Sequence, residues 1–170
     1  ITDRKYRELC RTAVRTHGCA VQHCKYSDDD VELALEAIAQ NPWAYIHLAQ
    51  PLQCNVTVAV AAVSGDCRLL GEMQWGRGMA MPRHLRSNKA VLMAAIKHHP
   101  KAVRYLPRHM RKDREVIELA IKGGWWRALS YATKKMKKDP ALVYEAYRHD
   151  PKSLRFASAS LRNGGLAQFM

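Results

Sequence analysis

The 170-residue sequence lacks a long apolar run. Its longest, Val56 to Val63, has eight residues and contains Thr57, whereas a membrane-spanning helix needs about 20 apolar residues. The start of the chain lacks the basic stretch, apolar stretch and small-residue cleavage site of a signal peptide. The first residue is Ile1 and not Met, so a targeting segment further upstream stays compatible with the sequence. We expect no transmembrane segment, and peripheral contact with an anionic membrane stays open.

Cysteines are few and irregularly spaced. The five are Cys10, Cys19, Cys24, Cys54 and Cys67. An odd number without regular spacing is not typical of a disulfide framework, so we interpret them as reduced thiols in an intracellular, reducing compartment, either the cytoplasm or an organelle interior. His17 and His23 flank Cys19 and Cys24, but four residues separate these two cysteines and no second pair follows. This is not zinc-site spacing, and we predict no metal site.

Recognisable catalytic constellations are also missing. The histidines lie mostly in basic segments, as His84 and His109 do, and none has a paired carboxylate at helical spacing. Gly76-Arg77-Gly78 has neither the spacing nor the Lys-Ser/Thr of a phosphate-binding loop. Asp28 to Asp30 is typical of a capped helix start, with Asp29 and Glu32 as the capping pair. The sequence therefore predicts a protein that is not an enzyme and binds no cofactor.

Acidic residues are scarce in the second half of the chain. Overall, 28 Lys and Arg against 15 Asp and Glu give a net charge of +13. Residues 1–82 carry 8 basic and 9 acidic groups, but residues 83–170 carry 20 basic and 6 acidic groups. This asymmetry indicates an acidic partner, which can be nucleic acid, an anionic membrane or an acidic protein. The alternative is a solvated surface that keeps the protein soluble.

Five internal repeats organise the sequence. Each begins at an Asp or Asn, whose side chain can accept hydrogen bonds from the free N–H groups of a first helical turn. Apolar residues follow at positions +3, +4, +7 and +8, which share one face of an α-helix. Position +7 is Ala in every repeat. The five markers are Asp30, Asn55, Asn88, Asp113 and Asp139.

A second apolar stripe in each repeat predicts a second short helix. Pro42, Pro100 and Pro151 open it at equivalent positions, and Gly123-Gly124 precedes it in the fourth repeat. The stripe comprises Tyr45, Leu48 and Leu52; Val103, Leu106 and Met110; Leu129, Ala132 and Met136; and Leu154, Ala157 and Leu161. A loop insertion over residues 71–81 interrupts the second repeat, and residues 1–29 look like a degraded N-terminal capping unit.

Stacked helix pairs bury the faces that a single pair leaves exposed. We therefore predict one all-α domain over residues 1–170. Its architecture is an α-solenoid of five to six two-helix repeats with a period of about 25–26 residues.

The repeats resemble a known family. Residues 113–121 (DREVIELAI) and 128–132 (ALSYA) have the acidic start, the apolar first helix and the Leu-x-Tyr/Phe-Ala second helix of the repeat known as domain of unknown function 4116. Residues 101–105 (KAVRY) and 153–157 (SLRFA) are similar. The resemblance spans roughly residues 28–163 and implies short helical hairpins with no catalytic residues to carry over. The second repeat departs from the pattern, because Cys67 replaces the expected Pro.

Basic residues recur at the junction that ends each repeat. Because equivalent positions of a solenoid share one edge, we predict a basic ridge that binds a partner. Its residues are Arg83, Arg86, Arg108, Arg111, Lys112, Lys134, Lys135, Lys137 and Lys138, with Arg162 at the last junction. Trp75, in the insertion, is a candidate loop anchor because Trp is enriched at interface hot spots. The alternatives are exposed junctions that are simply polar and a Trp75 that folds back onto the core.

The ridge and the charge asymmetry favour a non-enzymatic helical-repeat interaction module. We expect an accessory, docking or scaffold subunit of a multi-subunit complex that binds an acidic protein surface. The alternative is an RNA- or DNA-binding repeat protein that contacts phosphates through the ridge. Arg, His and Lys at the junctions suit phosphates but provide no code for reading bases.

Overall fold

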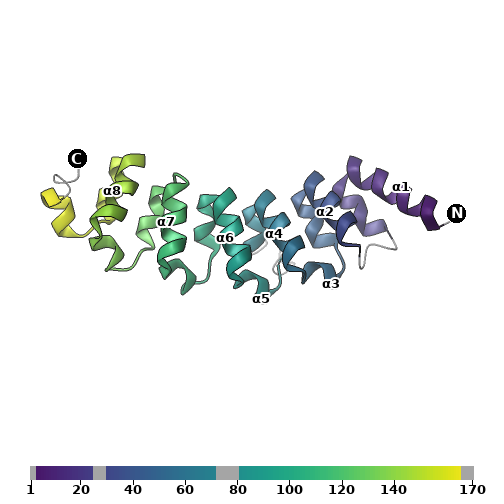
Figure 1. Cartoon of the computed structure of the whole chain (residues 1–170), viewed down its shortest axis with the longest axis horizontal. Coiled ribbons are helices and arrows are strands. Elements are labelled where there is room, and N and C mark those ends of the chain that lie inside the picture. The colour runs from purple at the N-terminus through teal and green to yellow at the C-terminus, as the bar shows by residue number, and fades with distance from the viewer. Residues whose placement is uncertain (1–2, 25–29, 72–80, 166–170) are drawn as a thin grey trace. The chain divides into compact units, whose positions relative to one another are not determined.

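The computed structural model describes residues 3–24, 30–71 and 81–165. Regular structure in these ranges is helical, without a strand (Figure 1), which confirms the predicted all-α class. The chain divides into two compact units, Ile1–His98 and His99–Met170. None of the described helices combines the length and apolar character needed to cross a membrane. A single continuous domain over residues 1–170 stays a prediction.

Each repeat marker begins a first helix, as predicted. These helices are α2 (Val31–Gln40), α4 (Val56–Gly65), α6 (Lys89–His98), α7 (Arg114–Lys122) and α8 (Pro140–His149). The side-chain oxygen of each marker accepts a hydrogen bond from a backbone N–H of the first turn, at N···O distances of 2.8 to 3.0 Å. Such a cap satisfies an N–H that lacks a partner within the helix and contributes about 1 kcal/mol. Asp28 and Asp29 lie outside the described residues, and Asp30 is the cap of α2.

The apolar face of each first helix is buried. Positions +3, +4, +7 and +8 after the marker are buried in all five helices, except Tyr147, which is half-buried. The alanine at +7 has 0% exposed surface in every repeat. Protein interiors are close-packed, so the small methyl group at this position sets how closely the neighbouring elements approach.

In the N-terminal unit, consecutive first helices form one layer. α1 (Asp3–Thr16) contacts α2, α2 contacts α4, and α4 contacts α6 (Figure 1). The second layer consists of the 3₁₀ helices η1 (Gly18–His23), η2 (Pro42–His47) and η3 (Cys67–Leu70). α2 contacts η1 and η2, and α4 contacts η2 and η3. Each of these helices therefore packs against the second element of its own repeat and that of the preceding one.

The C-terminal unit repeats this staggered packing. Its first layer contains α7 and α8, which contact each other. Its second layer contains the 3₁₀ helices η4 (Pro100–Tyr105), η6 (Trp126–Ser130) and η8 (Pro151–Phe156). α7 contacts η4 and η6, and α8 contacts η6 and η8. A short π-helical turn, η9 (Leu161–Gly165), follows η8.

The second half of each repeat differs from the prediction of one ten-residue helix. In the first, third and fourth repeats, a 3₁₀ helix is followed by a break and then by a short turn in α3 (Gln50–Gln53), η5 (Met110–Lys112) or η7 (Met136–Lys138). In the second repeat the short turn is α5 (Arg83–Arg86), and residues 72–80 before it lie outside the described part of the chain. Leu48 and Leu106 at two of the breaks are extended, with ψ angles of 155° and 151°. At Leu106 the cause is local, because Pro107 disfavours the helical conformation of the residue before it. The predicted stripe is nevertheless buried, apart from Met110 and Leu154, which are half-buried.

Side chains from one repeat position close these breaks. Gln53 donates through Nε2 to the carbonyl oxygen of Leu48 at 3.0 Å. Arg111 donates through Nε to the carbonyl oxygen of Leu106 at 2.7 Å, and Lys137 donates through Nζ to that of Ser130 at 2.9 Å. These bonds occupy carbonyl groups that a continuous helix would have satisfied. Two of the predicted ridge residues therefore also hold the fold together.

A close contact between glycine and proline joins neighbouring repeats. A Cβ atom added to Gly65 would lie 2.3 Å from Cγ of Pro42, and one added to Gly123 would lie 2.4 Å from Cγ of Pro100. Each proline opens a second element, and each glycine ends or follows the first helix of the next repeat. Cys67 stands in place of the proline in the second repeat, and the third repeat has His98 in place of the glycine. Trp126 stands in place of the proline in the fourth repeat, and the fifth has His149 in place of the glycine. The small residue is therefore required only opposite a proline ring.

Candidate interaction surface

Charges in the C-terminal unit separate by layer. Its acidic residues, Asp113, Glu115, Glu118, Asp139, Glu145 and Asp150, belong to α7, α8 or their caps. Segments 100–112, 125–138 and 151–163, which hold the second layer and its junctions, contain 13 Lys and Arg and no acidic residue. We call these cations the basic surface: Lys101, Arg104, Arg108, Arg111, Lys112, Arg127, Lys134, Lys135, Lys137, Lys138, Lys152, Arg155 and Arg162. All are exposed except Arg111 and Lys137, which are half-buried.

Three acidic groups of the first layer pair with arginines of the same layer. Arg114 in α7 donates to Asp139, the N-cap of α8, at 2.6 Å, and it also pairs with Glu118. Arg148 pairs with Glu145 at 3.5 Å. In the described part of the chain, the cations of the basic surface form no ion pair. The positive field of this unit is therefore concentrated on the second layer.

The Arg114 contact changes the titration of Asp139. Partial burial acts to raise the pKa of this carboxyl group, but hydrogen bonds from Arg114 and from the backbone N–H groups of Leu142 and Ala141 outweigh it and lower the pKa. Hydrogen bonds to Asp139 and Glu118 raise the pKa of Arg114. Asp139 is consequently ionised throughout the neutral range and remains a paired cap.

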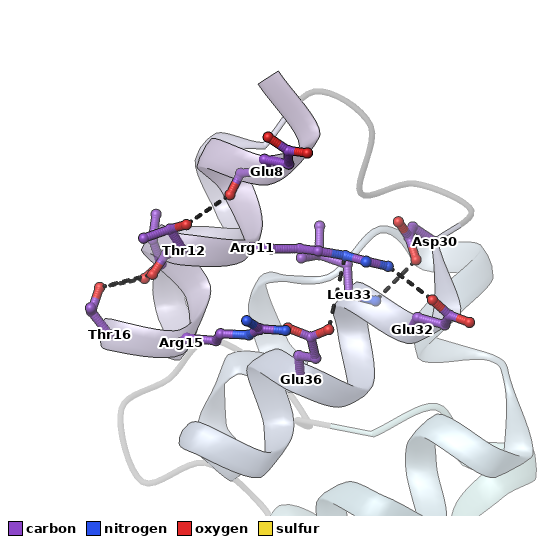
Figure 2. Close-up of polar contacts among 10 residues, drawn as sticks. Glu8, Arg11, Thr12, Arg15, Thr16, Asp30, Glu32, Leu33 and Glu36 are labelled. Carbon is purple, nitrogen blue, oxygen red and sulfur yellow. Dashed lines mark hydrogen bonds and ion pairs between the residues drawn. The ribbon is translucent and has the colours of Figure 1, made fainter. Parts of the chain in front are cut away.

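The first layer of the N-terminal unit shows the same internal pairing. Figure 2 shows Arg11 and Arg15 of α1 reaching across to α2. Arg11 lies 2.8 Å from a carboxylate oxygen of Glu32, and Arg15 lies 3.0 Å from one of Glu36. These contacts hold the predicted capping unit against the first clear repeat.

The predicted ridge residues fall in both units. Arg83 and Arg86 belong to α5 of the N-terminal unit, where Arg83 is exposed and Arg86 is half-buried. The other eight lie in the C-terminal unit and belong to the basic surface: seven at or beside η5 and η7, and Arg162 in η9. The loop anchor Trp75 lies outside the described residues.

A set of arginine–aromatic contacts was not predicted from the sequence. Arg104 lies against Tyr105, and Arg111 lies against Tyr131, with guanidinium-to-centroid distances of 5.5 and 5.2 Å. Trp126 is contacted by Arg127 and Arg155. The rings are half-buried and the arginines belong to the basic surface. The recurring Arg-Tyr and Arg-Phe pairs of the second elements could have indicated these contacts, but the repeat pattern placed the aromatics only by their apolar character.

The five cysteines are all free, and Cys10 and Cys24 are buried. Burial, a hydrogen bond with Cys10 and the charge of that neighbour raise the pKa of the Cys24 thiol to about 12. A thiol with this pKa is protonated at neutral pH. Among the residues that the structure describes, no three or more His, Cys, Asp or Glu gather as a metal site would require.

Comparison with known families supports the repeat assignment. Residues 88–134 and 113–162 match the family described as Domain of unknown function (DUF4116). The predicted resemblance is confirmed over residues 88–162. The two DUF4116 segments share residues 113–134, so each covers two successive repeats, and the whole basic surface lies within them. No curated protein and no solved structure matches the chain. Over residues 28–87 the resemblance stays a prediction.

Proposed function

We propose that this protein is a non-enzymatic interaction module, an accessory or docking subunit that binds an acidic protein partner through the basic surface. In this proposal the two-layer packing continues as an α-solenoid of five to six repeats and acts as a scaffold in a larger intracellular assembly. The observation that carries the proposal is the separation of charge between the layers of the C-terminal unit. That unit holds 16 basic and 6 acidic residues. Five of the acidic residues belong to α7, α8 or the N-caps of these helices, and the sixth, Asp150, lies between α8 and η8 and caps η8.

The electrostatics favour recognition over simple solubility. A solvated surface normally mixes both signs of charge, whereas the segments of the basic surface contain cations alone. A single-sign patch attracts a partner of opposite charge, accelerates association and excludes partners of like charge. Carboxylates of a partner protein would supply the opposite charge that the second layer lacks.

Nucleic acid is the alternative partner. The cations recur in each repeat of the C-terminal unit, and a row of them can follow a phosphate backbone. Reading of bases would additionally need aromatic faces open for stacking. Tyr105, Tyr131, Trp126 and Phe156 are already contacted by arginines, and Trp125 lies against Tyr131, which favours the protein partner.

A charge-reversal experiment tests the proposal. The variant Lys134→Glu, Lys135→Glu, Lys138→Glu changes three exposed lysines and spares Lys137, whose ammonium group bonds to Ser130. The matched control reverses three exposed lysines of first helices, Lys5, Lys97 and Lys122.

We expect the parent and the control to co-purify from their native source with the same protein partners in fixed ratio, and the variant to lose them. Retention of those partners by the variant would remove the basic surface as the docking site. Recovery of RNA in place of protein, with binding that falls steeply with salt, would establish the alternative.

A further inference from the structure

The strongest unassigned feature is a cluster built around Trp126. This ring begins η6 and is contacted by two arginines, Arg127 at 5.2 Å and Arg155 at 5.8 Å from its centroid. Phe156 lies 6.0 Å from Trp126, tilted by 32°, and Arg155 lies 4.6 Å from the centre of the Phe156 ring. η6 and η8 contact each other within the C-terminal unit, so the cluster joins two successive repeats.

The N-terminal unit contains a completed version of this arrangement. Arg68 lies 5.8 Å from the centroid of Trp43. Its guanidinium group donates to both carboxylate oxygens of Asp66, from Nε at 3.1 and 2.9 Å and from a terminal nitrogen at 2.6 Å. Asp66 also accepts a hydrogen bond from Nε1 of Trp43 at 2.9 Å. The chain itself therefore shows an arginine that lies on an indole ring and binds a carboxylate.

The Trp126 cluster lacks the carboxylate. Arg127 and Arg155 are exposed, and within the described residues neither forms an ion pair. An arginine that rests on an aromatic ring loses less conformational freedom when it binds, and its planar fork matches a carboxylate with two hydrogen bonds. Arg127 and Arg155 can therefore bind a carboxylate from outside the C-terminal unit.

We infer that the Trp126 cluster is the anchor for an acidic segment of a partner protein, whose carboxylates bind Arg127 and Arg155 as Asp66 binds Arg68. This deepens the proposed function and rests on it. The half-buried Trp126 and Phe156 rings provide apolar contact for aliphatic side chains between the carboxylates. Trp and Arg are the residue types most enriched at interface hot spots. Arg104 on Tyr105 and Arg111 on Tyr131 extend the same chemistry to neighbouring repeats.

Nucleic acid fits this anchor less well. An RNA base would need an open ring face, but Trp126 is contacted by two guanidinium groups and Phe156 by one. The arginine fork matches phosphate as well as carboxylate, so the relative affinity for the two kinds of partner is what distinguishes them.

The test compares two probes of equal charge on the full chain: a fluorescent peptide of alternating Glu and Leu, and a fluorescent oligo-uridylate. The variant is Arg127→Lys, Arg155→Lys, which keeps the charge and removes the fork. The control is Arg148→Lys in α8, an exposed arginine of the first layer. Binding is measured by fluorescence anisotropy, and thermal unfolding of each variant verifies the fold.

We expect the peptide to bind the parent more tightly than the oligo-uridylate does. We expect the double lysine variant to weaken peptide binding about tenfold and the control to behave like the parent. Equal peptide binding by the parent and the double lysine variant would overturn the anchor. If the triple reversal of Lys134, Lys135 and Lys138 still abolished that binding, the basic surface would stand without the anchor. Tighter binding of the oligo-uridylate would overturn both proposals.

Discussion

Arg114 of α7 donates a hydrogen bond to Asp139, the residue that caps α8, at 2.6 Å. Asp139 in turn accepts hydrogen bonds from the backbone N–H groups of Ala141 and Leu142. One carboxylate therefore both starts a helix and ties that helix to the preceding repeat. The contact also removes an acidic group from the field that the second layer presents.

Replacing Asp139 separates these two roles. Asp139→Ala removes the cap and the ion pair and is expected to lower the free energy of unfolding by about 1–2 kcal/mol. Asp139→Asn can still cap the helix and should lose less. Urea unfolding at neutral pH measures both. No loss for Asp139→Asn would contradict a separate contribution from Arg114, and equal losses for the two variants would contradict the contribution of the cap.

The lowered pKa of Asp139 predicts that the free energy of unfolding falls at acidic pH. The pKa of Asp139 is lower in the folded chain than the value of about 3.9 in an unfolded chain. Its contribution is therefore complete above about pH 4 and is lost as the pH falls through the folded pKa. The parent should lose stability there more steeply than Asp139→Asn does, as measured by unfolding between neutral and acidic pH. Parallel curves would show that the contact does not affect stability.

The raised pKa of Cys24 predicts that the free energy of unfolding falls at alkaline pH. Its pKa is raised to about 12, whereas a thiol in an unfolded chain ionises near pH 8.5. Because the folded state holds the proton more tightly, this contribution is complete below about pH 8.5 and is lost as the pH rises towards the folded value. Cys24→Ala should flatten the decline of unfolding free energy above that pH. Cys67→Ala, at a half-buried position, is the comparison.

The burial of the alanine at position +7 can be tested by introducing one charged side chain there. Ala120→Asp places a carboxylate where the native side chain has 0% exposure and should destabilise the C-terminal unit by several kcal/mol. Ala141→Asp, at an exposed site in the first turn of α8, is the control, because acidic residues are tolerated at a helix N-terminus. Thermal unfolding followed by circular dichroism distinguishes them. Parental melting of Ala120→Asp would show that the packing of α7 is wrong.

The contact between Gly123 and Pro100 predicts that a substitution of the proline restores part of the stability lost when the glycine is replaced. Gly123 has a φ angle of −74°, so Ala suits its backbone, but the added Cβ meets Pro100. Gly123→Ala should destabilise by about 1–3 kcal/mol, and Pro100→Ala in the same chain should recover part of the loss. Gly124→Ala meets no atom within 4 Å but requires a φ angle of +90°. It should cost about 1 kcal/mol, which Pro100→Ala leaves unchanged. A double-mutant cycle measures the coupling.

Local periodicity accounts for what could be predicted. The Asp or Asn caps and the +3, +4, +7, +8 faces depend on residues within one helical turn of each other, and this spacing is visible in the sequence. The conformation of the second elements was harder to predict from the sequence, because their apolar stripe is compatible with both a continuous helix and a broken one. Pro107 indicates one break from the sequence, whereas the break at Leu48 depends on the hydrogen bond from Gln53.

The sequence by itself determined the all-α class, the repeat boundaries, the caps, the buried faces and the excess of positive charge in the C-terminal half. Only the tertiary structure decided that Arg114 pairs with Asp139 and Glu118 within the first layer. It also decided that Arg127 and Arg155 converge on Trp126, and that Gly123 meets Pro100. The reason is physical: caps and helical faces follow from neighbours a few residues apart. Stacked rings, ion pairs and close contacts instead join separate repeats, and their partners are set by how those repeats pack.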